Sequence, residues 1–326
     1  MNILLTSWFS TYFKWTLVNS GLSLYVANKN IILKELDENG WILGDLETLK
    51  LKKKIENNSK VIKQLDLKIN YGIRSGLNEV FIIDDNKKNE LVKEDKKNIE
   101  IIRPILRGRD LVKYSYNYAN LWVVLAKYKD NLNLQNNYPT IYKYLEDFEI
   151  KLKNRGQVKA GSHHWIELDN SPTDEYISNF DKPKIIWIVL SDKGKFAYDD
   201  TGCLTTDSCF IMSGENLKYL ISILNSKIGE WYFAQISTTS GMGTNMWKKY
   251  KIEQFPIKIT TEVEMLKFDK IVNQILADKK QNLDTKALEN EIDVMVYKLY
   301  ELTYEEVLVI DASFGMSEQG YDAFTV

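Results

Sequence analysis

A loop with two glycines that runs directly into an apolar segment, Tyr71–Asp84, constrains the fold of this chain more than any other stretch. Gly72 and Gly76 permit backbone angles that residues with a Cβ disfavour, so the chain can turn tightly there. The apolar run behind the loop predicts a strand over Val80–Ile83. The loop therefore presents its polar side chains beside a buried strand, and these are Arg74, Ser75 and Asn78.

Further along the chain, apolar runs typical of strands alternate with segments of helical spacing. Leu121–Leu125 and Lys184–Leu190 are continuous and apolar, which indicates buried strands. Two more strands, Phe196–Tyr198 and Ser208–Met212, should pair near Lys184–Leu190, because Lys193-Gly194 and Thr201-Gly202 supply turns. Apolar residues at helical spacing predict helices over 39–68, 139–152 and 217–231. The pattern predicts an α+β fold, a twisted mixed β-sheet with flanking helices.

Beyond Pro256 the sequence changes to helix signals. Thr261 with Glu264 and Thr303 with Glu306 each have the spacing of a capping box, which opens a helix. Between them, Leu288, Ile292, Met295 and Leu299 recur at the spacing of a helix–helix seam. Residues 257–326 are therefore predicted to be a helical C-terminal arm with an acidic tail.

Two cysteines and the absence of a long apolar run limit where the chain resides. No apolar run reaches the roughly 18 residues needed to span a bilayer. Cys203 and Cys209 are interpreted as free buried thiols, which are typical of a reducing compartment. We expect a cytoplasmic protein.

The charge is unevenly distributed along the chain. The net charge is −2, which is unusual for a nucleic-acid binder. However, residues 101–165 contain eleven Lys or Arg against five Asp or Glu, whereas residues 289–326 contain one Lys against nine acids. A basic middle and an acidic end indicate that one face alone could meet nucleic acid.

A series of motifs in fixed order resembles one known family. The motifs lie between about Trp41 and Ile310 and are Gly72-Ile-Arg-Ser-Gly-Leu-Asn78, Pro104-Ile-Leu-Arg-Gly-Arg-Asp110, Tyr138-Pro139, Pro183-Lys184-Ile185, Leu224-Asn-Ser-Lys227 and Pro256-Ile257. Through them the chain resembles the TaqI-like C-terminal target recognition (specificity) domain of type IIG restriction–modification enzymes and adenine-specific DNA methyltransferases. We expect three parts: an N-terminal segment and linker helix over 1–70, an α+β target recognition domain over 71–256, and the arm over 257–326.

The resemblance implies a domain that reads duplex DNA beside a methyltransferase and, in some relatives, a nuclease of bacterial defence. The Asn-Pro-Pro-aromatic motif with which such methyltransferases hold a flipped adenine does not occur in the sequence. We therefore expect no catalytic residues and no cofactor or metal in this chain. S-adenosylmethionine, and Mg²⁺ where a nuclease is present, are expected on a catalytic domain or subunit outside it.

Base edges in the major groove are read by Arg, Lys, Asn and Gln, while Lys and hydroxyl groups bind phosphates. Four loops carry such residues. We predict DNA contacts from Arg74 and Asn78; from Arg107, Arg109 and Lys113; from Arg155, Lys159, Ser162, His163 and His164; and from Thr239, Ser240, Thr244, Asn245, Lys248 and Lys249.

Structural roles remain open for several of these residues. Arg107 could pair with Asp110 across its turn, and Asn78 could cap its own turn. Two other functions also remain open: a protein-interaction module that docks through the 288–299 seam, and a complete DNA-modifying enzyme with an unrecognised site.

Overall fold

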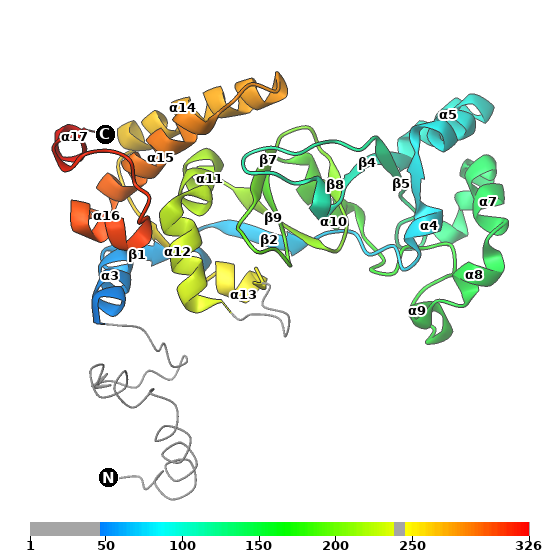
Figure 1. Cartoon of the computed structure of the whole chain (residues 1–326). Coiled ribbons are helices and arrows are strands. Elements are labelled where there is room, and N and C mark those ends of the chain that lie inside the picture. Colours follow the sequence, from blue (N-terminus) through cyan, green and yellow to red (C-terminus); the bar gives the residue numbers. More distant parts are fainter. Residues whose placement is uncertain (1–45, 238–244, 326) are drawn as a thin grey trace, which may run out of the picture. The chain divides into compact units, whose positions relative to one another are not determined.

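The computed structural model of the chain describes residues 46–237 and 245–325. Contacts divide the chain into two units, residues 1–53 and residues 54–326. Helix α3 (Leu46–Glu56) contains the described part of the first unit and continues into the second. All further elements belong to the second unit, whose course is coloured along the sequence in Figure 1.

An antiparallel sheet of four strands lies at the centre of the second unit. Its strand order is β2 (Leu67–Tyr71), β9 (Cys209–Gly214), β6 (Lys184–Ile188) and β7 (Phe196–Asp199). Strand β6 is therefore an inner strand, and every residue from Lys184 to Trp187 is buried. The prediction that the strands near 196–198 and 208–212 flank Lys184–Leu190 is confirmed.

A second four-stranded sheet is mixed. Its order is β3 (Ile82–Asp84), β5 (Leu121–Val124), β4 (Ile102–Leu106) and β8 (Leu204–Thr205), and the β4–β8 pair is parallel. A short antiparallel pair, β1 (Ser59–Val61) with β10 (Pro256–Lys258), completes the described strands. The α+β class is confirmed, with the strands divided among three sheets.

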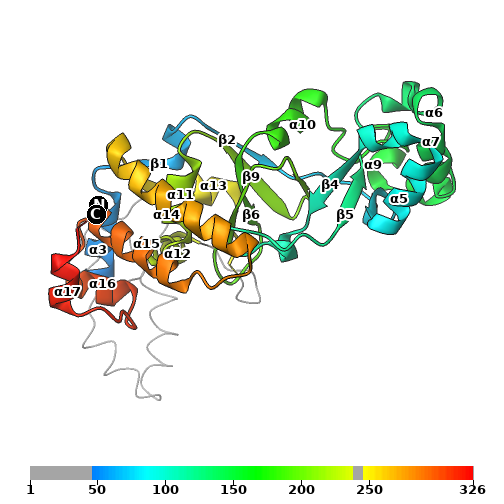
Figure 2. The ribbon, with the colours of Figure 1, turned by 90° about the horizontal axis from the view of Figure 1, so that it is seen from above.

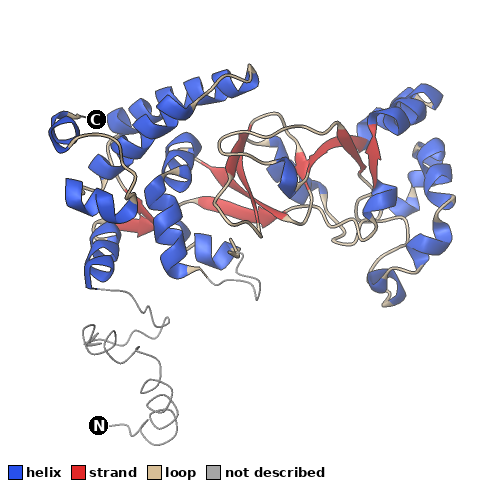
Figure 3. Cartoon of the chain, viewed as in Figure 1, coloured by secondary structure: helices blue, strands red, loops and turns tan. Residues whose placement is uncertain are grey.

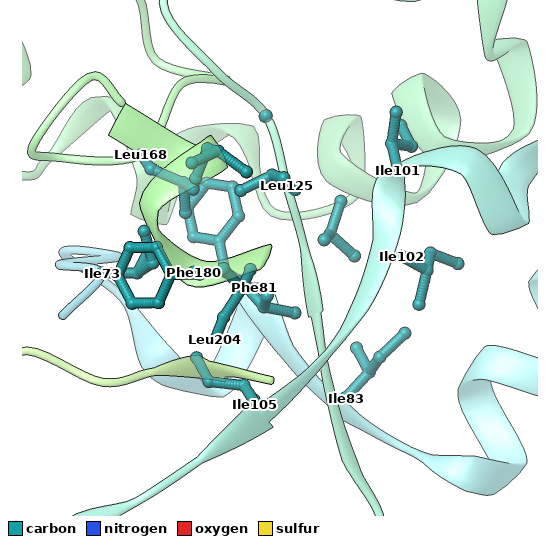
Figure 4. Packing of buried hydrophobic residues seen from close by; sticks show 14 of the residues in the cluster. Ile73, Phe81, Ile83, Ile101, Ile102, Ile105, Leu125, Leu168, Phe180 and Leu204 are labelled. Atoms are coloured by element: carbon teal, nitrogen blue, oxygen red, sulfur yellow. The ribbon is translucent and has the colours of Figure 1, made fainter. Parts of the chain in front are cut away.

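One apolar cluster connects the two four-stranded sheets. Figure 4 shows its side chains gathered between the strands and helix α10 (Asp174–Asp181), with Phe81, Ile105 and Phe180 among them. Ile186 and Ile211 from the antiparallel sheet belong to the same cluster. The domain therefore has a continuous core that holds both sheets.

A buried ion pair lies beside this core. The Lys184 side chain donates to the Asp199 carboxylate and, over 2.6 Å, to the Phe180 carbonyl. Asp199 also accepts hydrogen bonds from the Tyr116 hydroxyl at 2.7 Å and from the Cys203 amide at 3.2 Å. Burial would raise the pKa of Asp199, but the Lys184 charge and these hydrogen bonds outweigh it and lower the pKa.

Helices gather on either side of the strands, as the colours of Figure 3 show. Short ones follow the first strands: α4 (Asn78–Phe81), α5 (Asp85–Glu94), α6 (Leu134–Asn137), α7 (Pro139–Glu146), α8 (Glu149–Lys153) and α9 (Gly156–Lys159). Later ones follow the antiparallel sheet: α11 (Leu217–Asn225), α12 (Lys227–Ile236), α13 (Lys249–Ile252), α14 (Glu262–Lys280), α15 (Lys286–Leu299), α16 (Tyr304–Ile310) and α17 (Glu318–Ala323).

The last four helices form the predicted arm. Figure 2 shows α14 and α15 beside α11, and the contacts agree. Both capping boxes are present, at Thr261 with Glu264 and at Thr303 with Glu306. The seam residues Ile292 and Met295 are buried inside this unit, so the predicted docking surface over 288–299 is used internally, which contradicts its proposed role as a free interface.

Three predicted elements differ from the structure. The helix expected to reach residue 68 ends at Glu56, because Asn58 has a positive φ of 56° and the chain continues into strand β1. Val80 begins no strand, since the amides of Val80 and Phe81 both donate to the Leu77 carbonyl in a helical turn. The helix expected over 217–231 is two helices, because Ser226 is extended and caps α12.

The environment of the cysteines matches the prediction, since both are free and buried. Burial raises the pKa of the Cys209 thiol to about 12. Among residues 46–237 and 245–325, every helix is too short or too polar to cross a lipid bilayer.

We predict that Lys184→Met lowers the free energy of unfolding by about 3–5 kcal/mol, because it leaves the Asp199 carboxylate buried without its cation. Urea denaturation measures this loss. The matched control is Lys151→Met, which removes an ion pair with Glu79 whose side chains are both 61% exposed. Its loss should stay below about 1 kcal/mol. Equal losses in the two variants would contradict the structural role of the buried pair.

A half-buried carboxylate connects the arm to helix α12. Asp293 in α15 accepts a hydrogen bond from the Lys227 amide at 2.8 Å. Burial raises the pKa of Asp293 to about 6, although Lys113, Lys227 and Lys286 oppose the shift. Because an unfolded aspartate has a pKa of about 3.9, the folded state binds more protons between about pH 4 and pH 6. Ionisation of Asp293 therefore destabilises the fold as pH rises through this window.

We predict that the free energy of unfolding of Asp293→Asn, relative to that of the parent chain, rises by about 1–3 kcal/mol as the pH increases from 4 to 7. The reason is that the amide keeps the hydrogen-bond acceptor but carries no charge. Urea denaturation at a series of pH values gives the difference. A difference that does not change with pH would show that Asp293 does not titrate in this range.

Candidate nucleic-acid interface

The glycine loop is held on the β8–β9 turn by its backbone. The Gly72 amide donates to the Cys209 carbonyl at 2.9 Å, the Ile73 amide donates to the Thr205 carbonyl at 2.6 Å, and the Asp207 amide donates to the Ile73 carbonyl at 3.0 Å. A Cβ at position 72 would lie 2.1 Å from the Thr206 carbonyl oxygen, so only glycine fits this approach. The loop is thus fixed before any ligand binds.

The Arg155 side chain ties this loop to the segment 165–169. It is 3% exposed, and its guanidinium donates from all five N–H positions. The acceptors are the carbonyls of Leu152, Ser75, Trp165 and Glu167 and the Asp169 carboxylate, at distances of 3.1, 2.8, 2.6, 2.8 and 2.9 Å. Arg155 therefore has a structural role, since its guanidinium is buried and all its donors are used within the protein; its contact with DNA stays a prediction.

The basic turn after β4 is fixed by an internal ion pair. Arg107 donates to Asp110 from Nε at 3.1 Å and from Nη2 at 2.7 Å, and this bonding raises the pKa of Arg107. A Cβ on Gly108 would lie 2.5 Å from Ile188, so the turn packs closely on the end of β6. The alternative in which Arg107 pairs with Asp110 is confirmed, whereas Arg109 projects from this turn as an exposed residue.

The segment before α13 extends the same series of loops. The Val189 amide donates to the Ser208 carbonyl at 2.9 Å, and the Trp247 amide donates to the Val189 carbonyl at 2.7 Å. The Trp247 ring stacks on Phe233, with ring centroids 3.5 Å apart. Main-chain bonds and close packing therefore connect the glycine loop, the β8–β9 turn, the basic turn and the segment 245–248. We call this set the loop assembly, with 165–169 attached through Arg155.

Several predicted contact residues have structural roles in this arrangement. Lys113 donates to the Asn225 carbonyl at 2.8 Å, and burial lowers its pKa. Asn245 donates to the Asp192 carbonyl and accepts from the Ser237 hydroxyl. The His163 side chain is 1% exposed, with Nε2 3.3 Å from the Asp169 carboxylate. The side chains of these three residues are buried or bound within the protein, and their direct DNA contacts stay predictions.

The remaining predicted residues are on the surface. Arg74 is exposed and pairs with Asp207 at 3.2 Å, and Asn78 is exposed and accepts from the Ser75 hydroxyl at 2.6 Å. Lys249 donates to the Ile69 carbonyl at 3.0 Å. The side chains of the exposed Arg109, Lys159 and Ser162 and of the half-buried Lys248 have no hydrogen-bond or ion-pair partner among the described residues. Thr239, Ser240 and Thr244 lie outside the described residues.

His164 is exposed at the edge of the third loop. Partial desolvation of its ring lowers the pKa of His164, and nearby Lys153 and His163 act in the same direction. The ring is therefore neutral at pH 7, where it can exchange hydrogen bonds but adds no positive charge.

The sequence pattern does not predict the role of two acidic residues that position the loops. Asp169 binds Arg155 over 14 residues of sequence, and Asp207 binds Arg74 over 133 residues. No local pattern marks either pair, because the partners meet only after the loops fold together.

Comparison with known proteins finds a family model that matches the middle of the chain. Residues 103–257 match the model of the TaqI-like C-terminal specificity domain. This part of the chain is therefore similar to that specificity domain. The match confirms the central part of the expected resemblance, while the glycine loop and most of the arm lie outside the matched residues.

Similar proteins include two type II methyltransferases. M.MjaIV of Methanocaldococcus jannaschii is 23% identical over 256 residues, which cover 74% of this chain and 84% of that protein. M.BanIII of Aneurinibacillus aneurinilyticus is 26% identical over 226 residues, 62% of this chain and 36% of that protein. The chain thus spans most of one relative and about a third of the other.

Two solved structures are also similar at 12% identity. They are the type IIL restriction–modification enzyme MmeI in complex with DNA, with a TM-score of 0.49, and the type IIG restriction endonuclease BpuSI, with a TM-score of 0.46. The similarity covers 81% and 78% of this chain, but 35% and 33% of those proteins.

We predict that Arg155→Lys lowers the free energy of unfolding by about 2 kcal/mol or more, because an ammonium cannot reach the same five acceptors and leaves buried carbonyls unpaired. Urea denaturation measures the loss, and limited proteolysis should reveal faster cleavage within 161–170. Lys159→Ala in the same segment is the control, with a change within about 0.5 kcal/mol. A similar small change in both variants would contradict the clamp.

Proposed function

We propose that this chain recognises duplex DNA by sequence, as the specificity part of a type II restriction–modification system. The observation that carries the proposal is the loop assembly. Main-chain bonds connect the glycine loop with loops inside the matched residues 103–257. Exposed Arg109, Lys159 and Ser162 project from or beside these loops. Fixed loops with free polar side chains suit the reading of base edges, which demands correct register.

The exposed and half-buried candidate residues divide by the chemistry that they can offer DNA. Arg74, Arg109 and Asn78 have the side chains that read guanine and adenine in the major groove. Lys159, Ser162, Lys248 and Lys249 suit phosphate oxygens, which set position without carrying sequence information. Two acidic residues of the arm form ion pairs within the chain: Glu301 pairs with Lys258, and Glu306 pairs with Lys54. The net charge of −2 is therefore compatible with a local basic surface.

Methyl transfer to adenine is assigned by this proposal to a catalytic domain or subunit outside the chain. The sequence has no Asn-Pro-Pro motif, and the described residues contain no group of three His, Cys, Asp or Glu that could hold a metal ion. S-adenosylmethionine, and Mg²⁺ for a nuclease, would bind to that catalytic part.

Two exposed apolar side chains on helix α14 favour binding to a protein partner. Helix α14 exposes Val263 and Leu266, which are 68% and 64% exposed, while its other face is buried through Phe268 and Val272. These two side chains differ from the buried seam over 288–299. They give the alternative function, a protein-interaction module, a specific place on the arm.

We predict that the full chain selects a single motif from a randomised duplex pool, and that the motif persists between about 50 and 200 mM salt, because base contacts discriminate at both. Sequencing of the bound duplexes gives the motif. Lys248→Ala should keep the motif and reduce the dependence of log Kd on log salt by about one phosphate contact. Lys270→Ala, an exposed lysine on α14, is the charge-matched control with an unchanged slope.

The other outcomes are distinct. Unselective binding that disappears at the higher salt would show that recognition requires the catalytic partner. No binding at either salt would overturn the proposal and favour the protein-interaction module.

A further inference from the structure

Arginine is rare in this chain, and its few positions are informative. Lys and Arg together number 43, but only five of them are arginines: Arg74, Arg103, Arg107, Arg109 and Arg155. Lysine therefore supplies positive charge almost everywhere. Arginine differs from lysine by its planar fork of five N–H donors, which matches paired acceptors. A chain that otherwise uses lysine should keep arginine where this fork has a partner.

Four of the five arginines have such a partner within the protein. Arg74 pairs with Asp207, Arg103 with Asp181, Arg107 with Asp110 and Arg155 with Asp169, at 3.2, 2.7, 2.7 and 2.9 Å. Three of them bind a further acceptor or bind their carboxylate twice. In the described part of the chain, Arg109 is the one arginine whose side chain has no acceptor.

The backbone that carries Arg109 is fixed on both sides. The Arg107–Asp110 ion pair closes the turn, and the Leu111 amide donates to the Gly108 carbonyl at 3.3 Å. The Asn117 amide donates to the Asp110 carbonyl at 2.8 Å and secures the chain that follows. The turn is thus ordered without a ligand, which lowers the entropic cost of binding through Arg109.

The surroundings of this turn belong to the loop assembly. A Cβ on Gly108 would lie 3.2 Å from the Ser208 hydroxyl, and Ser208 follows Asp207, the partner of Arg74. Two guanidiniums therefore lie on loops in contact, one paired within the protein and one free of such a partner. The exposed Arg74–Asp207 pair, with side chains 55% and 39% exposed, is a weak surface interaction.

We propose that Arg109 is a specificity-determining residue that reads a guanine through its O6 and N7 atoms in the major groove. This inference rests on the proposed function and names the base that one residue recognises. Guanine O6 and N7 form an acceptor pair that matches the arginine fork, and this is the commonest specific contact of arginine with DNA. Arg107 and Asp110 fix the turn, and Arg109 supplies the contact.

The experiment compares the full chain with Arg109→Ala and Arg109→Lys in selection from a randomised duplex pool. Lys270→Ala is the charge-matched control, because Lys270 is exposed on α14 and outside the matched domain. In Arg109→Ala, the preference for guanine should be lost at one position, with the other positions kept. Affinity for the selected site should fall about ten- to a hundredfold. Thermal unfolding should be unchanged, since the side chain has no partner in the described protein.

A modified base then tests the contact itself. Replacing the recognised guanine by 7-deazaguanine removes the N7 acceptor. The parent chain should lose about tenfold or more in affinity for this duplex, whereas Arg109→Ala should bind both duplexes equally. Arg109→Lys should keep the salt dependence of the parent chain with a weaker preference for guanine.

Two results would overturn the inference while leaving the proposed function in place. One is an unchanged motif in Arg109→Ala. The other is an equal loss of affinity for all sequences together with a smaller salt slope, which would make Arg109 a phosphate contact. Failure of the parent chain to bind any duplex would instead overturn the proposed function.

Discussion

The two four-stranded sheets depend on the buried ion pair between Lys184 and Asp199. Lys184 lies in the inner strand of the antiparallel sheet, and its side chain also binds the end of helix α10. Asp199 accepts hydrogen bonds from the Tyr116 hydroxyl and the Cys203 amide. Tyr116 lies between β4 and β5 of the mixed sheet, and Cys203 directly precedes β8 of the same sheet. A buried charge without its partner is strongly unfavourable, so the pair fixes how these segments meet. The positions of the loops that follow these segments therefore depend on the ion pair.

Much of the fold could be predicted because its signals are local. Continuous apolar runs at Leu121–Leu125 and Lys184–Leu190 and the two capping boxes need only neighbouring residues to be read. The division of the strands among three sheets could not be predicted, since it depends on pairings such as β2 with β9, about 140 residues apart. The overlong helix prediction failed for a similar reason, because the pairing of Ser59–Val61 with Pro256–Lys258 outweighs local propensity.

The candidate site was predictable in its loops but not in the role of each side chain. Glycine spacing and basic residues located the loops, and the structure connects them. Arg107 and Arg109 look alike in the sequence, yet one closes the turn and the other is exposed. Arg155 also resembled a surface cation, and its five acceptors come from residues that are mostly distant in sequence. A guanidinium's role depends on which carbonyls surround it, and that is a tertiary property.

The loop assembly is connected largely by peptide groups. Amide-to-carbonyl bonds join the glycine loop, the β8–β9 turn and the segment 245–248, and the close approaches at Gly72 and Gly108 involve no functional side chain. Exposed positions such as 109, 159 and 162 take no part in these bonds. Mutation can therefore exchange the residues at these positions without dismantling their support. Under the proposed function, such an architecture separates the evolution of target choice from the maintenance of the fold, and single surface substitutions would give access to new recognition sequences.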